Sequence, residues 1–216
     1  MDPEAALWSA PASDRADRPL LVLLHGYGAD EKDLFALTSF LPDDFVCAAV
    51  RAPLAPPWPT PGYSWYPIED VTDAEVTGRD PARVTAAAST LVQWLDAATD
   101  PAQKVGLLGF SQGASVALQA LRMQPERFAF VVNLSGYAAP GELPRDAELE
   151  AARVPVFWGR GARDDVIPPA LVDHTAQWLP AHSDLSGRVY PGLTHSVSEE
   201  ELADVRAFLD KRLAAL

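Results

Sequence analysis

Residues 104–123 read KVGLLGFSQGASVALQALRM, and this stretch decides the fold. The run Lys104-Val105-Gly106-Leu107-Leu108 is short and apolar, as expected of a buried strand. The alanines and leucines after Gly113 favour a helix that Gln124-Pro125 ends. Between the strand and the helix lies Gly109-Phe110-Ser111-Gln112-Gly113, a G-x-S-x-G pattern. This arrangement is typical of a nucleophile elbow, which exposes a serine at the carboxyl edge of a sheet.

A serine nucleophile needs a histidine base and an acid that orients the histidine, and the chain supplies both downstream. Asp164 and Asp165 follow the predicted strand Val154–Trp158, and either carboxylate could accept the second imidazole proton. His195 lies between the last predicted strand, 186–190, and a helix that begins with the capping sequence Ser198-Glu199-Glu200-Glu201. The chain order serine, aspartate, histidine is that of enzymes with a nucleophile elbow. We therefore expect Ser111, one of the two aspartates and His195 to form a catalytic triad.

A second glycine-rich loop, His25-Gly26-Tyr27-Gly28, follows the predicted strand Pro19–Leu24. Its glycines allow a sharp turn, so the Tyr27 N–H could join the Gln112 N–H in a two-donor oxyanion hole. A plain strand-to-helix turn is the alternative. We expect His25 to bond the loop backbone rather than act as the base, because it precedes the serine in the chain.

The segment from Arg51 to Asp70 contains six prolines and therefore cannot form a central strand or the interior of a helix. Its aromatic residues either line an acyl or alcohol pocket or only cover the core. The candidate substrate-binding residues are Trp58, Tyr63, Trp65 and Tyr66.

The remaining pattern alternates strands with helices, which predicts an α/β fold with a mostly parallel sheet. Further strands are expected near 6–9 and at 45–50 and 128–134. Further helices are expected behind Asp30, from Asp80-Pro81 to about Thr99, and from Pro169 to about Leu179, before a polar loop at 180–184. About 20 residues separate the strand ending near Leu134 from the strand at Val154, enough for one short helix but not for a cap domain. The active site should therefore be an open cleft, without interfacial activation.

Composition narrows the class of protein. The 216 residues suffice for one domain spanning 1–216, and 48% hydrophobic with 22% charged residues is ordinary for a globular protein. A net charge of −13 disfavours binding to nucleic acid and to anionic membrane surfaces. No apolar run is long enough for membrane insertion, and the N-terminus does not resemble a secretion signal, so we expect a cytoplasmic protein. Cys47, the single cysteine, should be a small packed residue.

At these residues the chain resembles the carboxylesterase, phospholipase and acyl-protein thioesterase family of small α/β-hydrolases. The similar pieces are residues 24–28, 109–113, 161–168 and 194–198. The resemblance implies an α/β-hydrolase fold, a three-layer α/β/α sandwich without a cap domain. Its Gly-x-x-Asp-x-Val-x-Pro pattern selects Asp164 over Asp165 as the acid. Tyr27 stands where leucine is common in the family, and an oxyanion amide does not depend on that side chain.

The sequence thus predicts a serine hydrolase that cleaves carboxylic esters of short to medium acyl chains through an acyl-enzyme on Ser111. The alternatives are an acyl-thioesterase or lysophospholipase using the same triad, and a binding protein that has kept the fold without the chemistry. We expect no cofactor and no metal. The expected partner is a small-molecule ester, and a homodimer is compatible with the sequence.

Overall fold

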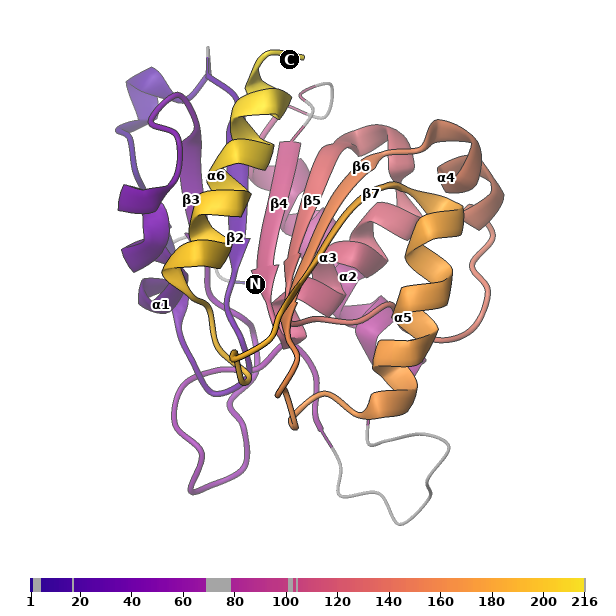
Figure 1. The fold of residues 1–216 in the computed structure, drawn as a ribbon. Helices are drawn as coiled ribbons and strands as arrows, with labels where there is room; N and C mark the ends of the chain where they lie inside the picture. Colours follow the sequence, from indigo (N-terminus) through magenta and orange to yellow (C-terminus); the bar gives the residue numbers. More distant parts are fainter. Residues whose placement is uncertain (2–4, 17, 69–78, 101–102, 104, 216) are drawn as a thin grey trace.

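The computed structural model describes residues 1, 5–16, 18–68, 79–100, 103 and 105–215 (Figure 1). The end of the predicted aromatic segment, Glu69 and Asp70, therefore lies outside the described residues. So do Asp2 to Glu4 of the N-terminus and Lys104, the first residue of the strand predicted before the elbow.

The centre of the molecule is a seven-stranded sheet in the order β1-β3-β2-β4-β5-β6-β7 (Figure 1). Strand β1 is antiparallel to its neighbour β3, and every other pair is parallel. The strands are β1 Ala6–Trp8, β2 Leu20–Leu24, β3 Val46–Val50, β4 Val105–Phe110, β5 Phe128–Leu134, β6 Pro155–Gly161 and β7 Asp184–Tyr190. The predicted, mostly parallel sheet is confirmed.

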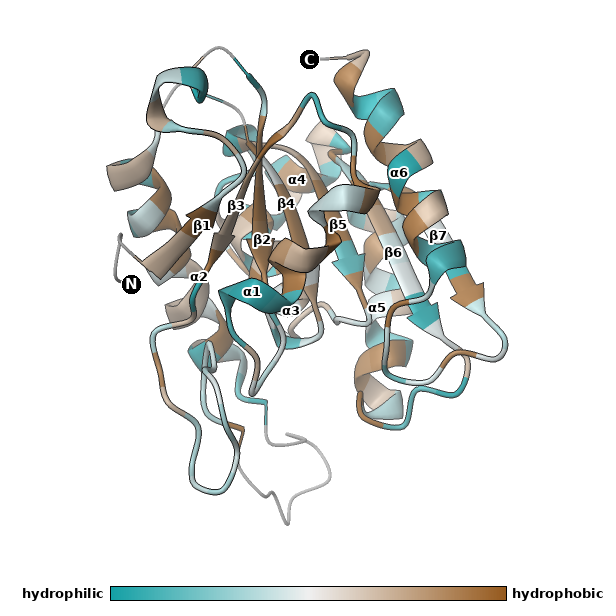
Figure 2. Ribbon diagram, turned by 90° about the vertical axis from the view of Figure 1, so that its left-hand side faces the viewer, coloured by the Kyte–Doolittle hydropathy of each residue, from teal (hydrophilic) through white to brown (hydrophobic). Residues whose placement is uncertain are grey.

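Helices cover both faces of this sheet. The helices are α1 Glu31–Phe35, α2 Pro81–Ala98, α3 Gln112–Met123, α4 Asp146–Ala152, α5 Pro169–His182 and α6 Glu199–Leu213. Residues of α2, α3, α4 and α5 share one buried apolar cluster with the strands. Residues of α1 and α6 share a second cluster on the opposite face. Apolar residues line the strands between these layers (Figure 2), so the predicted three-layer α/β/α arrangement is confirmed.

Strand β2 shows why the sequence places these strands in the middle of the sheet. Leu20, Val22 and Leu24 belong to the cluster on one face, whereas Leu21 and Leu23 belong to the cluster on the other. Successive side chains of a strand point to opposite faces, so a strand buried on both sides must be apolar at every position. A continuous apolar run of this length therefore predicts a central parallel strand.

Two helices differ from the sequence prediction. The helix capped by Asp30 is α-helical only over Glu31–Phe35 and continues as a 3-10 segment from Ala36 to Phe40. Helix α5 passes through Pro180 and ends at His182. The prediction that a loop begins at residue 180 is therefore wrong. The N–H of Ser183 donates to the carbonyl of Leu179 (3.0 Å), and the His182 ring stacks on Trp178. These contacts hold the last turn although proline supplies no N–H.

The segment between β5 and β6, residues 135–154, is fully described and contains α4 as its only helix. This agrees with the expected single short helix there. Among the residues that the structure describes, no helix combines the length and the apolar character needed to cross a membrane.

Glu201, in the first turn of α6, is fully buried against Gly159 of β6. Burial, assisted by the negative charge of Asp204, raises the pKa of Glu201 to about 7. The folded state therefore binds this proton more tightly than the unfolded state, and stability falls as pH rises from about 4.5 to 7. We expect Glu201→Gln to remove this loss of stability, which amounts to about 3 kcal/mol above pH 7.

The measurement is the free energy of unfolding of both proteins in urea between pH 4.5 and pH 8. The difference between the variant and the wild type should grow with pH in favour of Glu201→Gln. Glu200→Gln, an exposed position on the same turn, is the matched control and should show no such trend. A difference independent of pH would contradict the prediction.

Candidate active site

The turn between β4 and α3 holds Ser111 in a backbone conformation that serine rarely adopts, with φ 53°. The two flanking glycines are required by close approach of the backbone. A methyl group on Gly113 would lie 2.2 Å from the Leu24 carbonyl oxygen, and one on Gly109 would lie 2.5 Å from the Ala114 nitrogen. Both distances are far below van der Waals contact, so only glycine fits. The Ser111 N–H donates to the Leu134 carbonyl (2.8 Å), which fixes the turn on the sheet.

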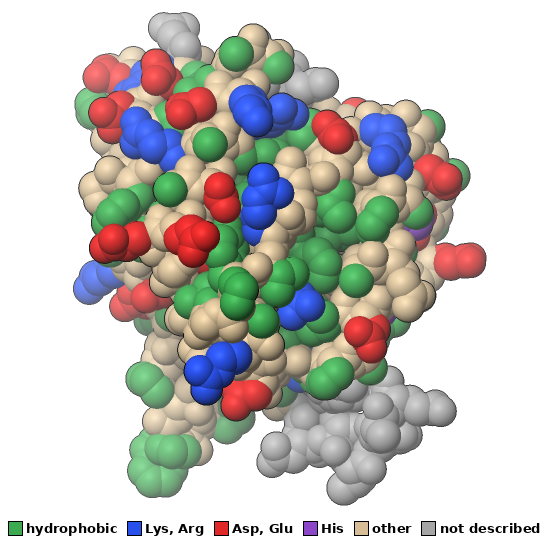
Figure 3. Space-filling model, viewed as in Figure 1, with side chains coloured by type: hydrophobic (Ala, Val, Ile, Leu, Met, Phe, Trp, Pro, Cys, Tyr) green, Lys and Arg blue, Asp and Glu red, His purple; other side chains and the backbone are tan. Residues whose placement is uncertain are grey.

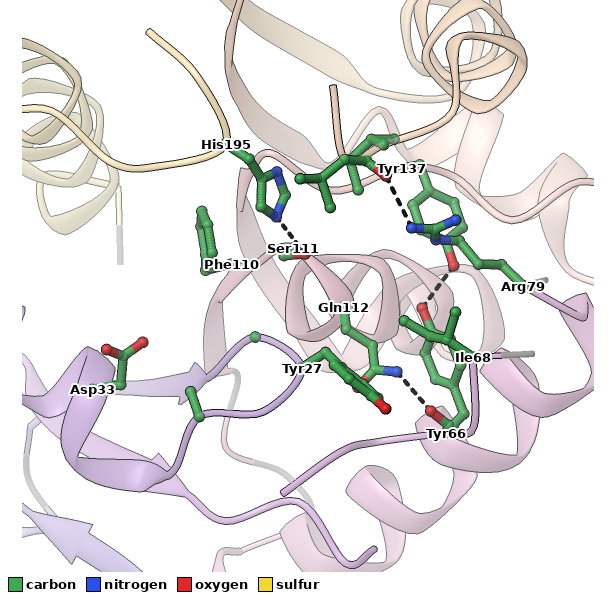
Figure 4. A pocket seen from close by; sticks show the side chains of 14 residues that line it. Tyr27, Asp33, Tyr66, Ile68, Arg79, Phe110, Ser111, Gln112, Tyr137 and His195 are labelled. Carbon is green, nitrogen blue, oxygen red and sulfur yellow. Dashed lines mark hydrogen bonds between the residues drawn. The ribbon is translucent and has the colours of Figure 1, made fainter. Parts of the chain in front are cut away.

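Ser111, His195 and Asp164 form a continuous hydrogen-bonded chain. His195 Nδ1 lies 2.7 Å from Asp164 Oδ2. On the other side of the ring, His195 Nε2 lies 2.8 Å from Ser111 Oγ (Figure 4). An ionised carboxylate only accepts hydrogen bonds, so the proton is on Nδ1 and Nε2 is the acceptor for the serine hydroxyl. The imidazole is thus in the tautomer that can remove the serine proton.

The carboxylate of Asp164 is held by backbone groups of its own loop. Asp164 Oδ1 accepts hydrogen bonds from the N–H groups of Val166 (3.0 Å) and Ile167 (3.2 Å). Burial acts to raise the pKa of Asp164, but the bonds from His195 and these two N–H groups outweigh it, and the pKa lies below its ordinary value. The neighbouring Asp165 is exposed. The structure places Asp164, as the family pattern selects, and not Asp165 against the imidazole.

Tyr27 and Gln112 both border the space in front of Ser111. Gln112 is the first residue of α3, where helix geometry leaves the backbone N–H without an acceptor inside the helix. Tyr27 lies in the loop that follows β2, a strand paired directly with β4. The two residues predicted to supply the oxyanion donors therefore follow adjacent strands and border the same cavity as Ser111.

A cavity of about 210 Å³ opens beside Ser111 and His195. Of the four aromatic residues predicted to bind substrate, Tyr66 lines it. The other three do not line it: Trp65 is buried in the core, Tyr63 packs under the Arg51 guanidinium, and Trp58 is 92% exposed. Trp58 belongs to the loop that follows β3, which projects at the lower left of the molecule with hydrophobic side chains at its tip (Figure 3). The segment thus divides between a cavity wall, core and surface.

Sequence reasoning missed several residues that line this cavity. They are Asp33, Ile68, Arg79, Phe110, Tyr137, Val166 and Ile167. Tyr137 hydrogen-bonds Tyr66 through their hydroxyl groups (2.6 Å), and the two rings form one buried wall (Figure 4). Tyr137 lies three residues after β5, at the same sheet edge as Ser111. The sequence signal that could have identified Tyr137 is its position just after a strand, because ligands of parallel sheets bind at the carboxyl ends of the strands.

His25 bonds loop backbone and Cys47 is a packed core residue, as expected from the sequence. His25 Nδ1 donates to the Gly26 carbonyl (2.7 Å), and its Nε2 accepts the Ala52 N–H (3.1 Å). Cys47 is buried in β3, and burial raises the pKa of its thiol to about 11. In the described part of the chain, no cluster of three or more His, Cys, Asp or Glu side chains could hold a metal ion.

Comparison with known proteins places this chain in a family. Residues 9–213 match the model of the phospholipase/carboxylesterase family. The chain is 33% identical to "Acyl-protein thioesterase 1" of Debaryomyces hansenii over 125 residues, which is 56% of this chain and 54% of that protein. Similar fractions hold for the baker's yeast protein of that name, so the chain spans little more than half the length of these curated relatives.

Solved structures of the same fold cover the chain more fully. Esterase PE8 is 30% identical with a TM-score of 0.73, over 96% of this chain and 98% of that one. Acyl-protein thioesterase 2 of Zea mays has a TM-score of 0.77 over 96% of this chain and 98% of that one, at 24% identity, and supports the fold alone. With nearly its whole length matching the family model, the chain belongs to the phospholipase/carboxylesterase family of α/β-hydrolases.

Proposed function

We propose that this protein is a serine hydrolase that cleaves carboxylic esters of short to medium acyl chains. The observation that carries the proposal is the hydrogen-bonded chain from Asp164 through His195 to Ser111, with separations of 2.7 and 2.8 Å. Membership in a family whose description names carboxylesterases supports the same reaction class.

In the proposed mechanism, His195 Nε2 removes the Ser111 proton as the serine oxygen attacks the ester carbonyl. Asp164 holds the imidazole in the required tautomer and stabilises the imidazolium that forms. The N–H groups of Tyr27 and Gln112 donate to the oxyanion of the tetrahedral intermediate. His195 then protonates the leaving alcohol, and a water molecule activated by the same histidine hydrolyses the acyl-enzyme.

A fluorophosphonate probe tests this proposal directly, because it phosphonylates only an activated serine. We expect one covalent label on the folded protein, located on Ser111 by peptide mass spectrometry. An unlabelled folded protein would favour the binding-protein alternative. Labelling and ester turnover should disappear together in Ser111→Ala.

We expect the dependence of rate on acyl length to reflect the limited size of the cavity. Its 210 Å³ correspond to about seven water volumes of roughly 30 Å³ each. Each methylene buried there contributes about 0.8 kcal/mol, so kcat/KM should rise about fourfold per added carbon. Beyond about four to six carbons, further methylenes lie in solvent, and the rate should level off or fall.

A series of p-nitrophenyl esters from acetate to laurate measures this profile. A rate that keeps rising to laurate would contradict it, as would a jump in activity when triacylglycerol passes from monomers to an emulsion. An acyl-thioester of equal chain length, assayed beside the esters, decides between esterase and thioesterase. The relatives named acyl-protein thioesterase make the thioester the substrate to compare first. Cytoplasmic location and the single domain over 1–216 stay predictions.

A further inference from the structure

The side chain of Gln112 makes two hydrogen bonds, both to the backbone of the loop that carries Trp65 and Tyr66. It is buried, at 2% exposure. Its Oε1 accepts the backbone N–H of Trp65 (2.7 Å), and its Nε2 donates to the backbone carbonyl of Tyr66 (2.7 Å; Figure 4). The amide therefore pairs with the loop as a neighbouring peptide group would, and it satisfies one donor and one acceptor of a buried backbone. We call residues 63–66 the strap.

The strap also binds the loop that carries Tyr27. The indole N–H of Trp65 donates to the His25 carbonyl (2.9 Å). On the other side of Tyr27, the Gly28 N–H donates to the Tyr63 carbonyl (2.9 Å), and the Tyr63 N–H donates to the Ala29 carbonyl (2.8 Å). Tyr27 is thus held by the strap through the residues on both of its sides.

His25 fixes the beginning of the same loop. Burial lowers the pKa of His25, which favours the neutral imidazole. Nε2 can then accept the Ala52 N–H (3.1 Å) while Nδ1–H donates to the Gly26 carbonyl (2.7 Å). The strap bonds backbone groups on both sides of Tyr27, and the His25 ring adds a further bond at Gly26, so the backbone around the Tyr27 peptide is held in place.

We propose that the Gln112 side chain is a positioning group for the oxyanion hole. Through the strap it sets the separation and the direction of the Tyr27 and Gln112 N–H groups. This inference rests on the proposed function, because it assigns a role in forming the tetrahedral intermediate. Donors act only when they lie about 2.7–3.1 Å from the oxyanion, and loss of one donor lowers kcat by about 10²- to 10³-fold.

A purely structural role for the same contacts is the competing explanation, because Trp65 and Tyr66 are also part of the buried core. The two roles differ in what they do to chemistry. Loss of packing reduces the folded fraction and slows every substrate by the same factor. Loss of positioning slows only reactions in which a strong acceptor develops at the carbonyl oxygen.

A thionoester separates these effects, since its carbonyl oxygen is replaced by sulfur, a weak hydrogen-bond acceptor. The ratio of ester rate to thionoester rate therefore measures what the oxyanion hole contributes, and it does not depend on the amount of folded enzyme. We would measure this ratio, kcat and KM for the wild type, Gln112→Met and Trp65→Phe. Gln93→Met, on the exposed side of α2, is the matched control.

We expect Gln112→Met, which can neither donate nor accept, to lower kcat for the ester about 10²-fold with KM changed less than about threefold. The ester-to-thionoester ratio should fall by a similar factor, while Gln93→Met changes neither. Trp65→Phe should show a smaller loss of the same kind. In the double variant, the loss of kcat should be smaller than the product of the two single losses, because both changes act through the strap.

Wild-type kcat and an unchanged ratio in folded Gln112→Met would overturn the inference, as would equal slowing of ester and thionoester. If Gln112→Met does not fold, Trp65→Phe carries the same test, since it removes the indole N–H that donates to the His25 carbonyl and keeps the Gln112 side chain. A wild-type protein that hydrolyses no ester would overturn the proposed function and this inference with it. An active wild type with unaltered variants would overturn the inference alone.

Discussion

Replacing Ser111 or His195 with alanine is expected to lower kcat for a p-nitrophenyl ester by about 10⁴-fold or more while leaving the fold intact. The serine supplies the attacking oxygen and the histidine receives its proton at Nε2, 2.8 Å away, so neither group works without the other. The double variant should consequently be little slower than either single variant.

Steady-state kinetics with thermal unfolding as a control for folding tests this expectation. The Ser111 hydroxyl bonds the His195 ring, and alanine removes only this one oxygen, so the melting temperature should shift little. Full activity in either folded single variant would remove that residue from the proposed triad. Multiplicative losses in the double variant would show that the two side chains do not act as one unit.

The second large effect is expected at the acid. Asp164→Asn should lower kcat by about 10⁴-fold, because an amide can donate to Nδ1 and thereby stabilise the wrong imidazole tautomer. The neighbouring change, Asp165→Asn, alters the formal charge equally but affects an exposed side chain, and it should keep most of the activity. The comparison isolates the role of the carboxylate that lies 2.7 Å from His195.

Measuring kcat and KM for both variants against the same ester is sufficient. The reverse ranking, with Asp165→Asn the slower enzyme, would show that Asp165 and not Asp164 orients the histidine. Equal activity in both variants would mean that neither carboxylate orients the base.

Several features could be predicted from the sequence because local physics enforces them. The run from Leu20 to Leu24 is apolar at every position, and only a strand buried on both faces needs that pattern. Gly109 and Gly113 flank Ser111 because the turn leaves no room for a methyl group at either position. Asp30, Asp80 and Ser198 accept N–H groups at the starts of α1, α2 and α6, as their positions before those helices indicate.

The aromatic segment shows the opposite case. Trp58, Trp65 and Tyr66 have similar neighbours in the sequence, rich in proline and aromatic residues. Yet they are 92%, 2% and 2% exposed, and only Tyr66 faces the cavity. A loop without periodicity gives no rule for which face a side chain takes. Its contacts with Gln112, His25 and Tyr137, all distant in the chain, decide the outcome.

The sequence by itself determined the layered fold, the elbow and the chain order of Ser111, the acid and His195, because strand burial, turn sterics and helix capping act over a few neighbouring residues. Tertiary structure alone decided which atoms meet. It put Asp164 Oδ2 and Ser111 Oγ on the two nitrogens of one imidazole, and it joined the Gln112 amide to the strap. Those contacts span from 31 to 84 residues of chain, and their geometry follows from how strands pack side by side in the sheet, which no local pattern records.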